Sequence, residues 1–419
     1  MVTDTQSSDV VVVGAGLAGL MCAATLQRRG LDVRLLEAGD TVGGRVRTDT
    51  VDGHLCDVGF QLLNPAYPAV KRFVDVDALQ LGTFMAGVRV RRGGESAVLA
   101  DPRRAPQLLP ATLASGLLDL REIAALTKWV GPVLVTPDRT MGGDDQPLGT
   151  ALDVAGIRGR IRREVLEPFL TGVLAEEPGS ASSIFARLLM RSFLLATPGL
   201  PAEGMQALPA QLASHLLQPA ETGVRVVAVD SGPSVRTGAG TIHARAVVVA
   251  TDVVDAASLD VVPAHAVGGL TTWWFSTPAG MPHDRLLVVD GDRGPVVNTA
   301  VVSAAAPTYA PDGRDLVEVT TLASARLTDD AARAEAGRLW QTSADGWDLL
   351  VRHDVTHALP VTRAPLDRRQ SVDLGDGLFV CGDHRDTPSI QGALVSGRRA
   401  ANAVLKRLAA GRTAGSGDA

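Results

Sequence analysis

A glycine-rich connection near the amino terminus constrains the fold more than any other feature of the chain. Asp9–Val13 is a short apolar run of the kind that forms a buried strand. Met21–Arg29 has the composition of a helix, and Asp32–Glu37 reads as a second strand. A strand, a helix and a second strand with short connections predict an α/β fold built on a doubly wound parallel sheet.

The connection between the first strand and the helix reads GAGLAG, which has the spacing of a dinucleotide-binding loop. Gly14 permits a tight turn, Gly16 lets the backbone approach a pyrophosphate, and Gly19 lets helix and strand pack closely. The free N–H groups at the start of the helix attract phosphate. We therefore expect a dinucleotide to be held by Gly14, Ala15, Gly16, Leu17, Ala18 and Gly19.

An acidic residue and a second glycine pair follow this loop. Glu37, with Ala38 after it, ends the second strand 18 residues beyond Gly19, where a carboxylate can accept both hydroxyls of an adenosine ribose. The stretch at 43–45, Gly43-Gly44-Arg45, adds another close backbone approach and a guanidinium. An enzyme that used only a nicotinamide cofactor would have no evident use for this second pair, so the pattern favours FAD.

The segment EAGDTVGGRVRT resembles the opening of a large flavoprotein superfamily that contains monoamine oxidases, protoporphyrinogen oxidases and phytoene desaturases. That family begins with E-A-x-x-x-x-G-G-R-x-x-T, and this chain is most similar to its desaturase-like members. The resemblance implies non-covalently bound FAD in a Rossmann-like, GR2-type domain. It also implies that this domain is interleaved with an α+β substrate domain.

Three later segments extend the resemblance. DVGFQ followed by AYP is similar to the desaturase segment beside the isoalloxazine ring, which implies contacts from Gly59, Phe60 and Gln61. The stretch that begins at Gly204 is similar to the segment around the adenine, where the backbone of Val226 would meet the base. The closing segment CGDHRDTPSIQGAL implies flavin contacts from Gly382, Asp383, Gln391, Gly392 and Ala393.

Changes in the local residue pattern along the chain predict two interleaved domains. Apolar helical stretches broken by prolines follow the amino-terminal unit, and β-branched runs recur after a short return to it. The FAD-binding domain is predicted at 8–78, 203–258 and 356–410. The substrate domain is predicted at 79–202, mostly helical, and 259–355, a sheet plus a helix, with a disordered tail at 411–419.

Lysine is nearly absent, because only Lys71, Lys128 and Lys406 occur among 40 basic residues. Amine oxidases of this superfamily place a lysine that holds a water near flavin N5. The position nearest to it here is Leu270, and the aromatic-cage position in the closing segment is Ser389 or a neighbour. An amine oxidase of the familiar kind is therefore disfavoured.

Few side chains are left to shape the reaction. Trp273, Trp274 and Phe275 could form an apolar wall of the substrate pocket over the flavin, or they could pack in the core. His384 and Gln61 are weak candidates for catalytic side chains. An ordinary histidine titrates near neutrality, but a loop histidine without a catalytic role is the alternative.

Composition excludes several other classes of protein. A formal net charge of −6 offers no basic surface for nucleic acid. The three cysteines have neither disulfide nor metal-site spacing, so we expect no metal and a reducing cytoplasm. No signal segment or membrane span is evident. The helical stretches Leu108–Leu118 and Arg121–Val135 could contact a membrane surface weakly, or form an ordinary lid.

These observations predict an FAD-dependent dehydrogenase or desaturase. We expect hydride to pass to flavin N5 from an apolar or conjugated small-molecule substrate, with oxygen or a quinone as electron acceptor. An amine oxidase or protoporphyrinogen-type oxidase that uses oxygen is the alternative. A more remote alternative is a flavin-binding module without catalytic activity.

Overall fold

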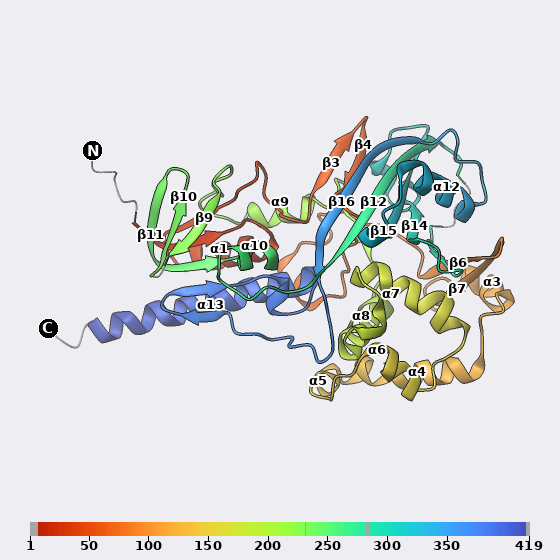
Figure 1. The fold of residues 1–419 in the computed structure, drawn as a ribbon, viewed down its shortest axis with the longest axis horizontal. Coiled ribbons are helices and arrows are strands. Elements are labelled where there is room, and N and C mark those ends of the chain that lie inside the picture. Colours follow the sequence, from red (N-terminus) through yellow and green to blue (C-terminus); the bar gives the residue numbers. More distant parts are fainter. Residues whose placement is uncertain (1–6, 231, 282–284, 416–419) are drawn as a thin grey trace.

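The computed structural model describes residues 7–230, 232–281 and 285–415, and its elements gather around two sheets (Figure 1). The first sheet collects strands from the beginning, middle and end of the chain in the order β17-β18-β11-β1-β2, with β10 and β9 continuing from β11. The strands are β1 (Ser7–Val13), β2 (Val33–Leu36), β9 (Val226–Asp230), β10 (Ser234–Thr237), β11 (Gly240–Val249), β17 (Asp373–Gly375) and β18 (Leu378–Val380).

The four central strands of this sheet are parallel, as the strand–helix–strand pattern predicts. Alternate valines of β1 enter different cores: Val10 and Val12 pack against α1 (Leu17–Gln27) and α13 (Ile390–Gly415). Val11 and Val13 pack on the other side, against α10 (Val253–Ser258). Both faces are covered, which explains why β1 is an uninterrupted apolar run rather than an alternating one.

The second sheet has the order β16-β12-β15-β14-β13-β6-β7 and lies beside the first (Figure 1). One face packs against α12 (Asp329–Trp340), and the other meets the hairpin of β3 (Thr48–Val51) and β4 (His54–Asp57). The sheet consists of β6 (Gly87–Arg92), β7 (Glu95–Ala100), β12 (Val267–Pro278), β13 (Leu287–Asp290), β14 (Val296–Val301), β15 (Arg314–Leu322) and β16 (Asp348–Pro360).

A helical group lies below the second sheet in Figure 1, around its own apolar core. It consists of η1 (Pro106–Leu108), α3 (Leu109–Ala114), α4 (Leu120–Val135), α5 (Pro137–Met141), α6 (Leu148–Val154), the π-helix η2 (Ile161–Leu166), α7 (Glu167–Leu174), η3 (Pro178–Ser180) and α8 (Ser183–Leu195). The remaining elements are α2 (Pro68–Phe73), β5 (Gly82–Thr83), β8 (Gly199–Leu200), α9 (Ala207–Ala213), α11 (Val302–Ala305), η4 (Pro307–Tyr309), η5 (Ala323–Ala325) and η6 (Asp383–Arg385).

The predicted α/β class is confirmed, while two local bounds were wrong. The segment 79–202, predicted to be mostly helical, also contributes β6 and β7 to the second sheet. A domain boundary at 355/356 would cut through β16, which runs unbroken to Pro360. Helix α13 continues to Gly415, where disorder was expected from 411, because no proline interrupts it. Residues 416–419 lie outside the described residues, and the division into two domains stays a prediction.

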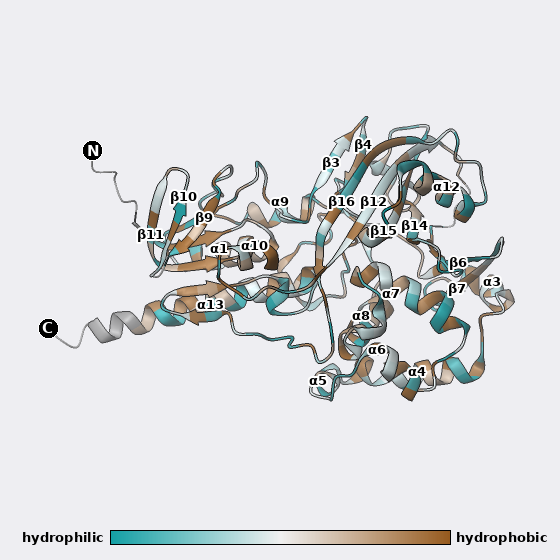
Figure 2. Cartoon of the chain, viewed as in Figure 1, coloured by the Kyte–Doolittle hydropathy of each residue, from teal (hydrophilic) through white to brown (hydrophobic). Residues whose placement is uncertain are grey.

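Figure 2 shows apolar and polar residues following one another along α4, as on an amphipathic surface helix. Among the described residues, no helix is both long enough and apolar enough to cross a membrane.

Candidate active site

The two glycine motifs of the amino-terminal region lie side by side. Gly16 and Gly43 form a parallel bridge, and the Gly43 N–H donates to the carbonyl of Ala15 over 2.9 Å. Gly44 adopts a φ of +61°, and a Cβ there would lie 3.3 Å from the Cα of Gly16. The second motif is therefore folded onto the first loop by the backbone itself.

The three glycines of the first loop differ in what makes them necessary. A Cβ on Gly19 would lie 1.9 Å from the carbonyl oxygen of Gly14, which itself has a φ of +99°. Packing therefore requires both of these glycines. A Cβ on Gly16 would meet no atom within 4 Å, and its φ of −70° suits any residue. The protein fold does not explain Gly16, whereas a phosphate at the start of α1 would.

The start of α1 suits an anion. Gly16 is the N-cap and makes no side-chain capping hydrogen bond, so the first N–H groups of an 11-residue helix have no side-chain acceptor. The next residues, Leu17 and Ala18, are buried in the first turn. This arrangement fits the pyrophosphate of a dinucleotide.

Glu37, the residue predicted to contact the ribose, lies beside the first glycine loop. Its two carboxylate oxygens accept the N–H groups of Ala15 and Gly39, each over 2.8 Å, which fixes the carboxylate beside the loop. The Glu37 carbonyl accepts the N–H of Val224 over 2.8 Å, just before Val226 begins β9. Glu37, Ala38 and Val226 are all half-buried, so a ligand could still reach this corner.

Arg45 joins the amino-terminal motif to the closing segment. Its guanidinium lies 2.7 Å from a carboxylate oxygen of Asp383 and donates over 2.7 Å to the carbonyl of Ala358. Burial opposes the charge of Arg45, but Asp383 outweighs it and raises the arginine pKa. The Asp383 side chain is only 3% exposed, so this ion pair holds together segments from opposite ends of the chain.

His384 is buried, and neither ring nitrogen has a hydrogen-bond partner among the described residues. Burial lowers its pKa to about 4, and Arg385 and Arg45 act in the same direction. The expected titration near neutrality is therefore wrong, because desolvation keeps the imidazole neutral. The ring packs so closely on Gly382 that a Cβ there would lie 2.5 Å from it.

The segment expected beside the isoalloxazine is anchored by Gln61. Its amide nitrogen donates to the carbonyls of Arg45, over 2.7 Å, and Val58, over 3.0 Å. Gly59 has a φ of +81°, and Phe60 meets Phe84 edge to face with ring centroids 6.2 Å apart. Since its side-chain N–H groups donate to backbone carbonyls, Gln61 has a positioning role in this segment.

The closing helix is attached to the same region. The side-chain carbonyl of Gln391 accepts the Ala69 N–H of α2 over 2.8 Å. A Cβ on Gly392 would lie 1.9 Å from the Thr387 carbonyl oxygen, so only glycine fits. The N–H of Ala393 donates to the Ser389 carbonyl over 3.0 Å. The structure thus places Gln391, Gly392 and Ala393 at the start of α13.

The aromatic residues of β12 lie on two different faces. Trp274 donates its indole N–H to the Asp57 carbonyl over 3.1 Å and faces the β3–β4 hairpin. Trp273 and Phe275 pack on the opposite face against α12, so they do not share a wall with Trp274. Successive side chains of a strand alternate between faces, so of these three candidate pocket residues only Trp274 faces the hairpin. By the same alternation, Leu270 lies on the Trp274 face.

A buried carboxyl network beside Trp274 was not predicted. Asp57 accepts hydrogen bonds from Thr48 over 2.5 Å, the Met205 N–H over 2.9 Å and the Tyr309 hydroxyl over 3.0 Å. Burial raises the Asp57 pKa to about 6, although these three donors oppose the shift. Tyr309 is 252 residues from Asp57 in sequence, so no local pattern could indicate the contact.

The Asp57 pKa leads to a stability prediction. Because burial raises the folded-state pKa from 3.8 to about 6, the free energy of unfolding should fall by about 3 kcal/mol in total as pH rises from below 3.8 to above 6. Asp57→Asn keeps the shape but cannot ionise. Relative to wild type, this variant should become more stable by about 1.4 kcal/mol between pH 5 and pH 8. Urea unfolding of both proteins at the two pH values measures this, and equal pH dependence would contradict it.

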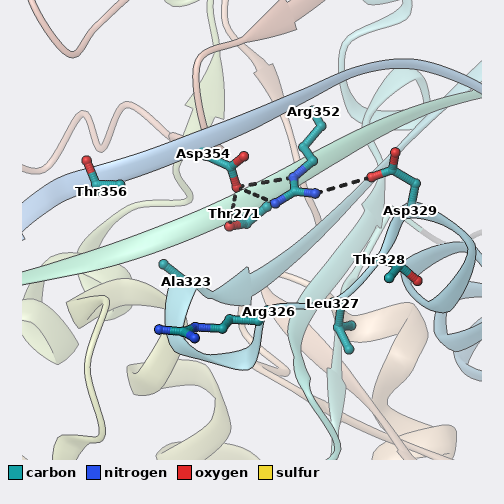
Figure 3. Close-up of a pocket in the computed structure, with 9 residues that line it drawn as sticks. All are labelled: Thr271, Ala323, Arg326, Leu327, Thr328, Asp329, Arg352, Asp354 and Thr356. Atoms are coloured by element: carbon teal, nitrogen blue, oxygen red, sulfur yellow. Dashed lines mark hydrogen bonds and ion pairs between the residues drawn. The ribbon is translucent and has the colours of Figure 1, made fainter.

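A cavity of about 570 Å³ opens on the other face of β12 and β16 (Figure 3). Arg352 lies between Asp354, at 3.0 Å, and Asp329, at 3.6 Å, and Thr271 also bonds Asp354. The charges of these three side chains are therefore already paired. Thr271 faces opposite to Leu270, which separates this cavity from the Trp274 face.

Comparison with known proteins agrees with this geometry. The family model of the flavin-containing amine oxidoreductases matches residues 17–405. Putrescine oxidase from Kocuria rosea is 47% identical over 92 residues, which cover 22% of this chain and 18% of that protein. Hydroxyneurosporene desaturase from Rubrivivax gelatinosus is 48% identical over 59 residues, which cover 14% of this chain and 11% of that protein. Each alignment thus covers a small part of the relative.

Solved structures extend the likeness of fold to nearly the whole chain. Wild-type putrescine oxidase bound to putrescine superposes with a TM-score of 0.73 over 96% of this chain and 100% of that one, at 18% identity. The glycine cradle, the Glu37 corner and the Arg45–Asp383 pair all fit a flavin dinucleotide. The chain therefore belongs to the flavin-containing amine oxidoreductase family and is an FAD-dependent oxidoreductase.

Proposed function

We propose that this protein is a dehydrogenase or desaturase that oxidises an apolar or conjugated small molecule. One observation carries the proposal: the position that would hold the amine-oxidase lysine is Leu270, in a row of aliphatic side chains. Leu270 pairs with Val355 of β16 and Leu322 of β15, and a Cβ on Gly59 would lie 3.5 Å from Val355 Cγ2. An aliphatic row beside the predicted flavin segment suits an apolar substrate.

The chain's own residues would hold FAD, without a covalent bond, at both ends. We assign the pyrophosphate to the glycine cradle and α1, the ribose to Glu37, and the ribityl or phosphate region to the Arg45–Asp383 pair. FAD when bound supplies two-electron oxidation by accepting hydride at N5. The remaining assigned contacts are Gly59, Phe60, Gln61, Val226, Gly382, Gln391, Gly392 and Ala393.

The titratable groups near the aliphatic row support a reaction without side-chain acid–base catalysis. His353, opposite Thr272 on the Trp274 face, is paired with Asp49 over 2.9 Å. Asp57 has both carboxylate oxygens hydrogen-bonded, and His384 stays neutral above about pH 4. We infer that the proton lost from the substrate passes to solvent.

An oxidase of an amine, which uses oxygen, is the second candidate. The family match and the fold shared with putrescine oxidase favour it. The absence of lysine between Lys128 and Lys406 opposes it. Contact of the helical group with a membrane surface, from which an apolar substrate could be taken, remains a proposal; Leu113 and Leu120 are exposed there.

Anaerobic reduction of the bound flavin separates the two candidates. We would add phytoene in detergent micelles, or putrescine, to the oxygen-free holoenzyme and follow the flavin absorbance. Bleaching by phytoene but not by putrescine is the expected result. Bleaching by putrescine alone would contradict the proposal.

Leu270→Lys should impair binding of an apolar substrate without creating a better enzyme. A lysine ammonium in the aliphatic row must be desolvated, so KM for the substrate should rise about tenfold. Leu270→Met is the matched control and should leave KM nearly unchanged. Steady-state kinetics measure both variants. A gain of amine oxidation in Leu270→Lys would instead favour the second candidate.

A further inference from the structure

Polar side chains form a row on the Trp274 face of the second sheet, next to the aliphatic row. Thr272 of β12 pairs with Thr320 of β15, which pairs with Asn298 of β14. Glu318 lies two residues before Thr320 on β15 and is opposite Trp274. All four therefore point to the face that meets the β3–β4 hairpin.

Hydrogen bonds order part of this group. The hydroxyls of Thr272 and Thr320 are 2.9 Å apart, and Thr320 donates to Glu318 Oε2 over 2.9 Å. Glu318 is fully buried, yet its Oε1 has no partner among the described residues. Asn298 is 8% exposed, and its Oδ1 has no partner there either.

Two buried atoms without partners on one sheet face require an explanation, because each costs free energy when it lacks a hydrogen bond. Asn298 and Glu318 are diagonal neighbours across β14 and β15, about 7–8 Å apart at Cα. Burial raises the pKa of Glu318 well above its usual range, which favours the neutral carboxyl. A neutral carboxyl can both donate and accept a hydrogen bond.

The register places this group on the same sheet face as the aliphatic row. Helix α7 packs closely on Asn298, because a Cβ on Gly172 would be 2.4 Å from the Asn298 amide nitrogen. Asn298 lies two strands away from Leu270 and is displaced by two residues along the strand direction. This spacing separates the two Cα atoms by roughly 12 Å. A substrate against the aliphatic row could therefore reach the polar group with its far end.

We propose that Glu318 and Asn298 form a subsite that binds a hydroxyl or amine N–H of an otherwise apolar substrate. The bound group lies roughly 12 Å from the oxidised carbon near Leu270. The inference rests on the proposed function in one respect, that the substrate lies against the Trp274 face. It adds that the preferred substrate carries a polar group beyond the apolar part that a hydrocarbon such as phytoene also offers, and that this polar end selects and orients it.

The test uses two isomers that differ only in the ability to donate. 1-Octanol has a hydroxyl, whereas heptyl methyl ether has the same formula and can only accept. Binding of each to the holoenzyme is measured from the perturbation of the flavin absorbance spectrum. Wild type should bind the alcohol about tenfold or more tightly than the ether, because buried acceptors stay unpaired with the ether.

Variants of Glu318 and Asn298 test whether these residues cause the preference for the alcohol. Glu318→Leu and Asn298→Leu should each reduce the preference for the alcohol, and the double variant should bind the two isomers equally. Glu318→Gln keeps an acceptor and a donor of the same shape, so it should retain the preference. Glu318→Gln and Asn298→Leu keep the test decisive if Glu318→Leu fails to fold.

The outcomes separate this subsite from the proposed function. Wild type that binds both isomers equally, or an unchanged preference in Asn298→Leu and the double variant, overturns the subsite and makes the group structural. If putrescine reduces the flavin while the preference still depends on Glu318, the subsite stands and the desaturase proposal fails. If phytoene reduces the flavin and wild type shows no preference, only the subsite fails.

Discussion

Gly16→Val should fold normally and bind almost no FAD. A side chain at this position meets no protein atom within 4 Å, and its backbone conformation suits valine. The side chain would instead occupy the space beside the first turn of α1, where we place the pyrophosphate. Hydrogen bonds to a charged group contribute about 1.5–3 kcal/mol each, so losing them should weaken FAD binding by roughly 100-fold or more.

Two further glycine variants make this result specific. Gly238→Val also places its Cβ in open space, but in the turn between β10 and β11, and should retain FAD. Gly19→Ala would place a Cβ 1.9 Å from a backbone oxygen and should destabilise the fold itself. FAD content after purification and the melting temperature report on the three variants. Full FAD content in Gly16→Val would show that the cradle does not hold the pyrophosphate.

Arg45→Ala should lower the free energy of unfolding by about 3 kcal/mol, because it leaves a buried carboxylate without its cation. Asp383, 3% exposed, bonds the Arg45 guanidinium over 2.7 Å. The same change should release FAD, since it detaches the closing segment from the second glycine motif. Urea unfolding of the flavin-free proteins separates the first effect from the second.

A double-mutant cycle with Asp383→Ala isolates the pair. Removing both partners should cost less than the sum of the single changes, because no charge then stays buried alone. Arg236→Ala is the matched control, since its ion pair with Asp230 over 3.1 Å is more exposed and should contribute less than about 1 kcal/mol. Additive effects of Arg45→Ala and Asp383→Ala would show that the ion pair does not join the two segments.

Local sequence predicted the parts of the fold that depend on local rules. The helix predicted within 259–355 is α12, where Thr328 caps the amino terminus by accepting the Ala331 N–H over 3.2 Å. The first strand and its glycine loop were equally predictable from the sequence, because a strand buried on both faces is apolar throughout. β6 was missed although its valines alternate with arginines, which is the pattern of a half-buried strand.

The parts that escaped prediction depend on distant contacts. The hydrogen bond from Trp274 to Asp57, 217 residues away in sequence, shows which face of β12 is directed toward the segment expected beside the flavin. The low pKa of His384 comes from burial, which its loop sequence does not reveal. The unpartnered atoms of Glu318 and Asn298 likewise appear only when β14 and β15 lie side by side.

The most direct test of the central claim, oxidation without amine-oxidase chemistry, is reoxidation of the flavin. The holoenzyme is reduced by light without oxygen and then mixed with either dissolved oxygen or a soluble quinone while its absorbance is followed. We predict fast reoxidation by the quinone and slow reoxidation by oxygen with little peroxide. Fast reoxidation by oxygen with one peroxide formed per flavin would contradict the claim and establish an oxidase.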